Sequence, residues 1–145
     1  MSESVEFFIP IHLDSLNRRQ GRHWAARWRK DKGKGDAAFL MFCASVPVAW
    51  RVSAPHPRRR VIFTVIRRRE LDKDNLWGGL KPVIDGLKCQ PIRVKGVPKI
   101  FGYTEGLYFD DRAQFVDLDA KQELWEKGFP EGVEEGIKVE VSIVE

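Results

Sequence analysis

Cysteine is scarce in this chain of 145 residues: Cys43 and Cys89 are the only two, and neither belongs to a CxxC or Cys/His group. The sequence therefore predicts neither a structural zinc site nor a disulfide scaffold. Runs of 18 or more apolar residues are absent as well, so no transmembrane helix is expected. The opening residues, MSESVEFFIP, lack the basic patch and apolar stretch of a secretory signal. We expect an intracellular, cytoplasmic protein.

Apolar residues make up 43% of the sequence, which is too many for a disordered chain. A chain of this length matches one ordinary domain and can bury a core without covalent links. No internal repeat or low-complexity tract divides it. We therefore expect a single domain over residues 1–145.

The spacing of apolar residues predicts an α+β fold, in which a small mixed β-sheet packs against two main helices. The strand at 60–67 is apolar on both faces, which is typical of a central, covered strand. Gly33 and Gly35 leave open whether the first helix begins before or after them. The stretch 88–108 is expected to be a long loop. The predicted strands are 5–13, 60–67, 113–119 and 137–143, and the predicted helices are about 22–46 and Asn75 to about Lys88.

The net charge of +4 conceals two halves of opposite sign. Residues 1–69 hold 15 Lys and Arg against 5 Asp and Glu, whereas residues 70–145 hold 10 against 16. The first half is therefore strongly basic, which predicts an anionic partner such as nucleic acid.

The basic residues of the first half fall into three clusters. The densest is NRRQGRHWAARWRKDKGK (17–34), which has eight Lys and Arg, one acid and two tryptophans. Arginine triplets follow at 58–60 and 67–69. Basic clusters with interleaved aromatics are typical of surfaces that bind nucleic-acid phosphates and bases. A solvated helix face, together with charges that flank a strand, stays open as the alternative.

An acidic stretch, LDKDNLWGGLKPVIDGL (71–87), follows one of the predicted strands. On an extended backbone residues i and i+2 point to the same side, so Asp72 and Asp74 would converge. Adjacent carboxylates repel each other unless one is protonated or a divalent cation joins them. A second acidic pair, Asp110–Asp111, precedes a later predicted strand and would supply another ligand. Such a site predicts phosphodiester hydrolysis, with Lys81 as the cation that faces the phosphate.

The same residues also fit a simpler structure. The sequence D-x-D-N is typical of a turn that caps a helix, with Asn75 or Asp74 as the capping residue. The two interpretations are compatible, because one residue can cap the helix while an aspartate binds metal. Asp85 and Asp117 are individually uninformative and are more typical of surface or structural acids.

LDKDNLWGGLKPVIDGL followed by YFDDRAQFVD resembles the RusA family of Holliday junction resolvases. The shared pattern is a strand that ends in basic residues, D-x-D-N-L, a lysine, a D-[AG]-L helix segment and a later D-D pair. The stretch SLNRRQGRHWAARWR also resembles the family's basic segment with its asparagine. The resemblance covers most of residues 7–119, and its two acidic blocks are the specific part.

The resemblance implies a homodimeric enzyme that uses Mg²⁺, or Mn²⁺ in its place, to make paired symmetric nicks across a four-way DNA junction. Asp72, Asp74 and Asp111 map onto the metal-binding carboxylates, and Lys81 maps onto the catalytic lysine. No small-molecule cofactor and no membrane partner are implied. The residues expected to bind the junction arms are Asn17, Arg18, Arg19, Arg22, Arg27, Arg29, Lys30, Arg67, Arg68 and Arg69.

Three features depart from the family pattern. Compact members place the lysine four residues after the second aspartate, whereas Lys81 follows Asp74 by seven, across an added WGG. At 3.6 residues per turn, Lys81 still lies on the side of Asp74 if the helix begins early. The long insertion between Asp85 and Asp110 is basic, and it is expected either to contact DNA or to have no role. The tail after Asp119 is acidic and is expected to face away from DNA.

The leading hypothesis is therefore a crossover junction endodeoxyribonuclease. A non-catalytic DNA-binding accessory protein on the same scaffold stays open, because the acids and the lysine then serve as helix caps and surface charges. A nuclease that acts on other branched or flapped DNA also stays open. An RNA-binding module is disfavoured, because the RRM and KH signatures are absent.

Overall fold

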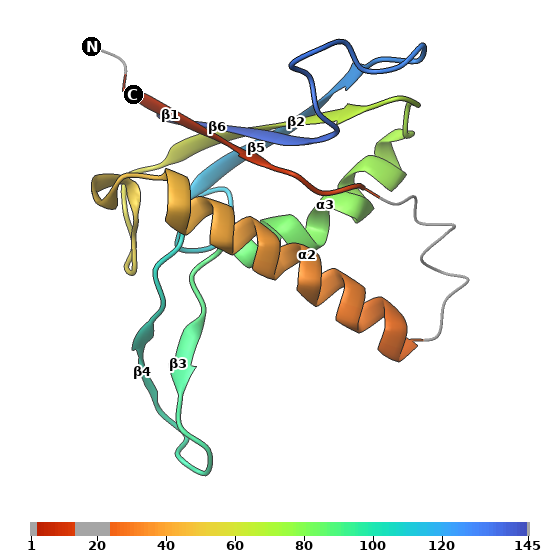
Figure 1. Cartoon of the computed structure of the whole chain (residues 1–145). Helices are drawn as coiled ribbons and strands as arrows, with labels where there is room; N and C mark the ends of the chain where they lie inside the picture. Colours follow the sequence, from red (N-terminus) through yellow and green to blue (C-terminus); the bar gives the residue numbers. More distant parts are fainter. Residues whose placement is uncertain (1–2, 14–23, 145) are drawn as a thin grey trace.

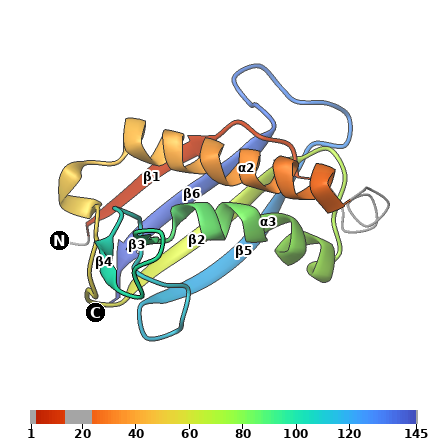
Figure 2. The same cartoon turned by 90° about the horizontal axis from the view of Figure 1, so that it is seen from below.

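The computed structural model describes residues 3–13 and 24–144. A four-stranded sheet forms one layer, and two helices form the second layer beneath it (Figures 1 and 2). The expected α+β class, with a small mixed sheet and two main helices, is confirmed. The elements are β1 (Ser4–Ile9), α2 (Trp24–Ser45), the 3-10 turn η1 (Val48–Trp50), β2 (Arg59–Arg67), α3 (Lys73–Leu87), β3 (Pro91–Arg93), β4 (Ile100–Tyr103), β5 (Val116–Leu124) and β6 (Gly136–Ile143).

The main sheet has the order β1-β6-β2-β5, so β2 is a central strand as predicted. β2 pairs antiparallel with β6 and parallel with β5, and the parallel register joins Arg59 to Val116 and Arg67 to Leu124. A parallel neighbour requires a long crossover connection. That crossover contains α3, which returns the chain from the end of β2 to the level at which β5 begins.

Helices cover only one face of the sheet in the described part of the chain (Figure 1). Val61, Phe63 and Val65 point to the helices and are at most 1% exposed. On the other face Ile62 is half-buried, and its cross-strand neighbours are the charged Asp119 and Glu140. β2 is a covered strand as predicted, because Thr64 and Ile66 of its outer face are also buried. Charged side chains, not a second helical layer, flank that face.

The two helices cross where Gly35 of α2 meets Gly86 of α3. A Cβ atom placed on Gly86 would lie 2.6 Å from the Cα of Gly35, which is closer than folded structures permit. α2 runs through both Gly33 and Gly35 and does not begin after them. At Gly35 the absence of a side chain lets the two helix backbones approach. Glycine in a helix interior costs about 1 kcal/mol relative to alanine, and the close packing of α2 on α3 offsets that cost at this position.

Three other predicted segments differ from the structure. The strand expected at 5–13 ends at Ile9, because Pro10 has no N–H to donate to the sheet. β5 begins at Val116, three residues later than expected, because Phe115 N–H and Val116 N–H both donate to Arg112 O in a turn. The stretch 88–108, expected to be a loop, contains the two-stranded antiparallel sheet of β3 and β4. None of the described helices is long and apolar enough to cross a membrane.

The helix crossing gives a test of the packing. We expect Gly86→Ala to lower the free energy of unfolding by roughly 1–3 kcal/mol, the usual cost of overpacking. Gly33→Ala is the matched control, because nothing lies within 4 Å of its added Cβ, and it should raise stability by up to about 1 kcal/mol. Urea unfolding measures both changes. A Gly86→Ala protein as stable as the wild type would contradict the close contact.

Candidate functional site

The first acidic group lies at the N-terminal end of α3. Asp72 is the N-cap: its Oδ1 accepts from Asn75 N–H at 2.9 Å, and its Oδ2 accepts from the Asn75 side-chain amide at 2.8 Å. Asp74 lies in the first turn and is exposed. The expectation of two carboxylates on one side of an extended backbone is therefore wrong. The capping interpretation is correct, although Asp72 is the cap and not Asn75 or Asp74.

α3 begins at Lys73, early enough to place Lys81 on the same side as Asp74. Seven residues make nearly two turns, which separates the two along the axis by about 10 Å. The ion-pair partner of Lys81 is Asp85, at 3.7 Å, and Lys88 approaches the same carboxylate at 3.8 Å. Asp85 was uninformative in the sequence, and only its i, i+4 spacing from Lys81 could have indicated this ion pair. We call Asp74, Lys81 and Asp85 the α3 row.

The second acidic pair lies at the C-terminal end of α3. Cys89 N–H donates to Tyr108 O at 3.1 Å, and the Tyr108 hydroxyl donates to Ile84 O at 2.7 Å. Burial raises the pKa of Tyr108 well above its usual range, and the nearby charges of Asp111 and Asp85 add to this rise. Asp111 therefore lies close to the end of the helix that carries Asp85.

The three carboxylates expected to bind metal do not come together in one chain. Asp72 and Asp74 follow the end of β2, whereas Asp111 precedes β5, which starts beside the first residue of β2. The 15 residues of α3 lie between them, a length of roughly 22 Å. Within residues 3–13 and 24–144, no three His, Cys, Asp or Glu side chains form a group that could hold a metal ion. The predicted three-carboxylate set does not fit one ion.

Asp110 and Asp111 form a hydrogen-bonded pair. Burial raises the pKa of Asp110, but hydrogen bonds from Asp111 and Arg112 outweigh it and leave the pKa below its usual value. Arg112 Nε donates to Asp110 Oδ2 at 2.7 Å, and Asp111 N–H donates to Asp110 Oδ1 at 2.9 Å. Arg112 thus supplies part of the positive charge that compensates the two adjacent carboxylates.

The arginine triplet at 58–60 does not form one basic surface. Arg59 is buried, and its Nη1 donates to Trp50 O at 2.6 Å and to Leu107 O at 2.8 Å. Arg60 pairs with Asp117 at 3.2 Å. Arg58 is exposed. The triplet therefore links elements of the fold more than it offers charge to a partner.

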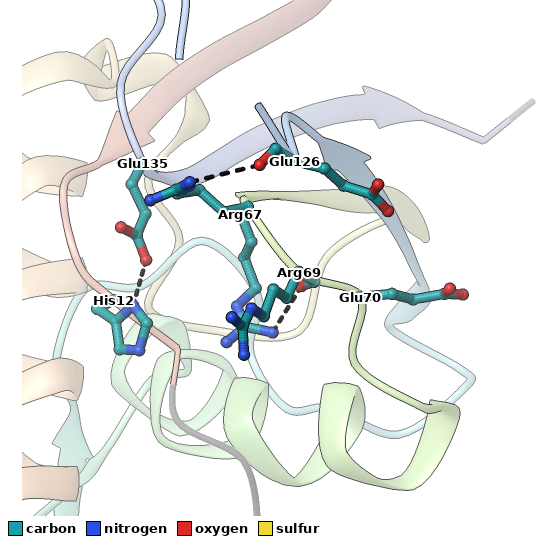
Figure 3. Close-up of a pocket in the computed structure, with 7 residues that line it drawn as sticks. His12, Arg67, Arg69, Glu70, Glu126 and Glu135 are labelled. Carbon is teal, nitrogen blue, oxygen red and sulfur yellow. Dashed lines mark hydrogen bonds and ion pairs between the residues drawn. The ribbon is translucent and has the colours of Figure 1, made fainter. Parts of the chain in front are cut away.

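The triplet Arg67, Arg68 and Arg69 lines a pocket of about 630 Å³ at the end of β2 (Figure 3). Three glutamates and His12 share the lining, and His12 is paired with Glu135. Arg67 Nη1 donates to Arg69 O at 2.8 Å, and Arg68 reaches Glu126 O at 3.4 Å. The arginines are gathered as expected, but the glutamates offset much of their charge.

Helix α2 and part of the α3 row line a common pocket. This second pocket, of about 710 Å³, lies between α2 and α3, and its lining includes Trp28, Phe39, Lys81 and Asp85. The charged residues that α2 adds to the lining are Asp31, Lys32 and Asp36. Trp28 is 60% exposed. Of the DNA-binding residues expected in the basic segment 17–34, Arg27, Arg29 and Lys30 lie near the start of α2. The others lie outside the described residues: Asn17, Arg18, Arg19 and Arg22.

No protein-family model matches the chain, and no curated protein or solved structure matches it either. The resemblance to the RusA family therefore rests on the sequence motifs alone.

His56 holds the segment that leads to the acidic pair, and its titration gives a test. Its Nε2 accepts from Phe109 N–H at 3.0 Å and its Nδ1 donates to Pro57 O at 2.8 Å, so the ring is neutral. Burial, assisted by the charge of Arg59, lowers the pKa of His56 below its usual 6.5. As the pH falls through about 6.5, the unfolded chain takes up the proton first, so the free energy of unfolding should fall.

We expect His56→Gln, which does not titrate, to remove part of this acid sensitivity. The measurement is urea unfolding of both proteins at about pH 7.5 and about pH 5, the range in which histidine titrates. The loss of stability on acidification should be larger for the wild type. Equal losses would show that the folded ring accepts a proton as easily as the unfolded one.

Proposed function

We propose that the protein is a Mg²⁺-dependent endonuclease that acts as a homodimer and resolves four-way DNA junctions by paired symmetric nicks. The observation that carries the proposal is the pocket between α2 and α3, which Trp28 lines together with Lys81 and Asp85 of the α3 row. The cation of Lys81 can face a phosphodiester, and the exposed ring of Trp28 offers the attached base a stacking surface.

The surroundings of the α3 row also support a DNA substrate. The triplet Arg67–Arg69 lies beyond its N-terminal end, and the basic insertion that follows Asp85 lies beyond its C-terminal end. Lys81 is 70% exposed on its side chain, so its pair with Asp85 is worth at most about 1 kcal/mol and yields readily to a phosphate. DNA laid along α3 would meet basic side chains beyond both ends.

Mg²⁺ usually keeps several waters and takes only one or two protein carboxylates, the remaining ligands being substrate phosphate oxygens. Two pairs are close enough in the chain for that role: Asp72 with Asp74, and Asp110 with Asp111. When bound, the ion would orient water and stabilise negative charge that develops on the phosphate. The residues of the chain contribute the cation of Lys81 and the basic surfaces that hold the strands.

A non-catalytic protein that binds branched DNA is the second candidate, and two contacts favour it. Both carboxylate oxygens of Asp72 are used in the helix cap, and Arg112 compensates the charge of Asp110. These acids have structural partners without a metal ion. The two candidates differ in a single observable, which is strand cleavage.

The test is incubation of the purified protein with labelled four-way junction, linear duplex and flap DNA, with and without Mg²⁺ or Mn²⁺. We expect metal-dependent cleavage of the junction. Asp74→Asn and Asp111→Asn should each be assayed, and loss of the ligating pair should lower the cleavage rate on the order of 100-fold. Junction binding should be retained or become tighter. Asp119→Asn is the matched control, because this exposed carboxylate lies on the face of the sheet without helices.

The two variants also identify the end of α3 at which cleavage occurs. Loss with Asp74→Asn alone assigns the reaction to the N-terminal end, and loss with Asp111→Asn alone assigns it to the C-terminal end. Salt-sensitive junction binding without cleavage in either metal would establish the non-catalytic candidate instead. Cleavage of flap DNA in preference to the junction would assign a different branched substrate.

A further inference from the structure

The β3–β4 hairpin projects away from the two-layer body of the protein (Figure 1). Residues 90–101 are all exposed, and they comprise β3, the first two residues of β4 and the turn between the strands. A two-stranded hairpin on its own is marginally stable in water. This one therefore depends on its attachment to the body and leaves its outer part free for a partner.

The exposed part combines apolar and basic side chains. It holds five of the ten large apolar side chains that are exposed in the described part of the chain, and Phe101 is 53% exposed. No Asp or Glu occurs between Asp85 and Glu105. Lys99 Nζ lies 5.4 Å from the centre of the Phe101 ring, so a cation accompanies the largest apolar group. The apolar residues are Ile92, Val94, Val97, Ile100 and Phe101, and the basic residues are Arg93, Lys95 and Lys99.

The root of the hairpin is held firmly. Thr104 N–H donates to Gln90 O at 2.9 Å, and Gln90 N–H donates to the Thr104 hydroxyl at 2.9 Å. Below them Gly106 exchanges two hydrogen bonds with Val52, at 2.8 and 2.9 Å. At about 3.3 Å per strand residue, the seven residues from Cys89 to the turn extend the hairpin by roughly 20 Å. The hairpin is thus an arm with a fixed base.

The base of the arm adjoins the acids at the C-terminal end of α3. The side-chain amide of Gln90 donates to Asp85 O at 3.0 Å. Tyr103 packs edge-on against Phe109, with ring centres 4.7 Å apart, and Phe109 directly precedes Asp110. A polymer held by the arm would therefore pass beside Asp85 and the second acidic pair.

We propose that this hairpin is a DNA-contacting arm, whose apolar tip packs against unstacked bases at a branch point while Arg93, Lys95 and Lys99 bind the adjacent phosphates. The inference deepens the proposed function and rests on it. A two-stranded ribbon fits the major groove, and apolar wedges of architectural proteins insert between base steps. DNA at a branch point offers both apolar base faces and a dense row of phosphates, which matches both kinds of side chain on the arm.

The test is equilibrium binding of the full chain to labelled four-way junction and to linear duplex, in EDTA so that no strand is cut. Phe101→Ala should weaken junction binding about tenfold, as expected when one base loses its stacking partner, and should change duplex binding less. Lys95→Gln with Lys99→Gln should reduce the slope of log K against log salt by roughly 0.9 for each phosphate that the protein no longer neutralises. The controls are Leu40→Ala, an exposed apolar residue of α2, and Lys121→Gln with Lys127→Gln.

The outcomes separate this proposal from the proposed function. If the arm variants lose junction binding and the wild type cuts no DNA, the arm proposal is supported and the endonuclease proposal is wrong. If the wild type cuts junctions and both arm variants bind and cut as it does, the arm proposal is wrong and the endonuclease stands. Loss of a dimer in analytical ultracentrifugation, without a change in DNA binding, would show that the arm joins two copies instead. Circular dichroism and urea unfolding confirm that each variant folds, since the altered side chains are exposed.

Discussion

The arrangement of the whole molecule depends on the burial of Leu107 and Tyr108 against the last turn of α3. Both side chains are fully buried, and burial of side chains of this size is worth about 1.5–3 kcal/mol each. The Tyr108 hydroxyl donates to Ile84 O, and the buried Arg59 donates to Leu107 O. Helix α3, strand β2 and the root of the hairpin meet at these two residues. Their position decides where the arm leaves the body and where Asp110–Asp111 lie.

α3 acts as a spacer between two chemically different ends. Its first turn carries the Asp72 cap beside the pocket of Arg67–Arg69, and its last turn adjoins the second acidic pair and the basic arm. Between them Lys81 and Asp85 line a pocket together with Trp28 of α2. The Gly35–Gly86 contact holds the two helices close enough for Trp28 and Lys81 to line one pocket. A packing requirement at the glycines thus shapes the candidate site.

Elements with a strong local pattern were predictable from the sequence, and the others were not. β2, α3 and β6 have clear apolar periods, so their types and approximate limits followed from spacing alone. The path of α2 through Gly35 depended on its contact with Gly86, which local propensity does not contain. The hairpin was missed because its apolar residues face solvent and follow no buried period. β5 was placed three residues early because a turn at Phe115 interrupts an apolar run.

For the candidate site, the sequence by itself determined which residues carry charge and that a D-x-D-N motif caps a helix. It left open which residue is the cap and whether the helix begins early enough to bring Lys81 to the side of Asp74. Only the tertiary structure decided that Arg59 points inward, that Lys81 pairs with Asp85, and that Asp111 lies far from Asp72. The physical reason is strand direction. β2 and β5 are parallel, so residues that precede β5 lie a full strand length from residues that follow β2. Sequence motifs specify order along the chain, whereas the pairing of strands sets which ends meet.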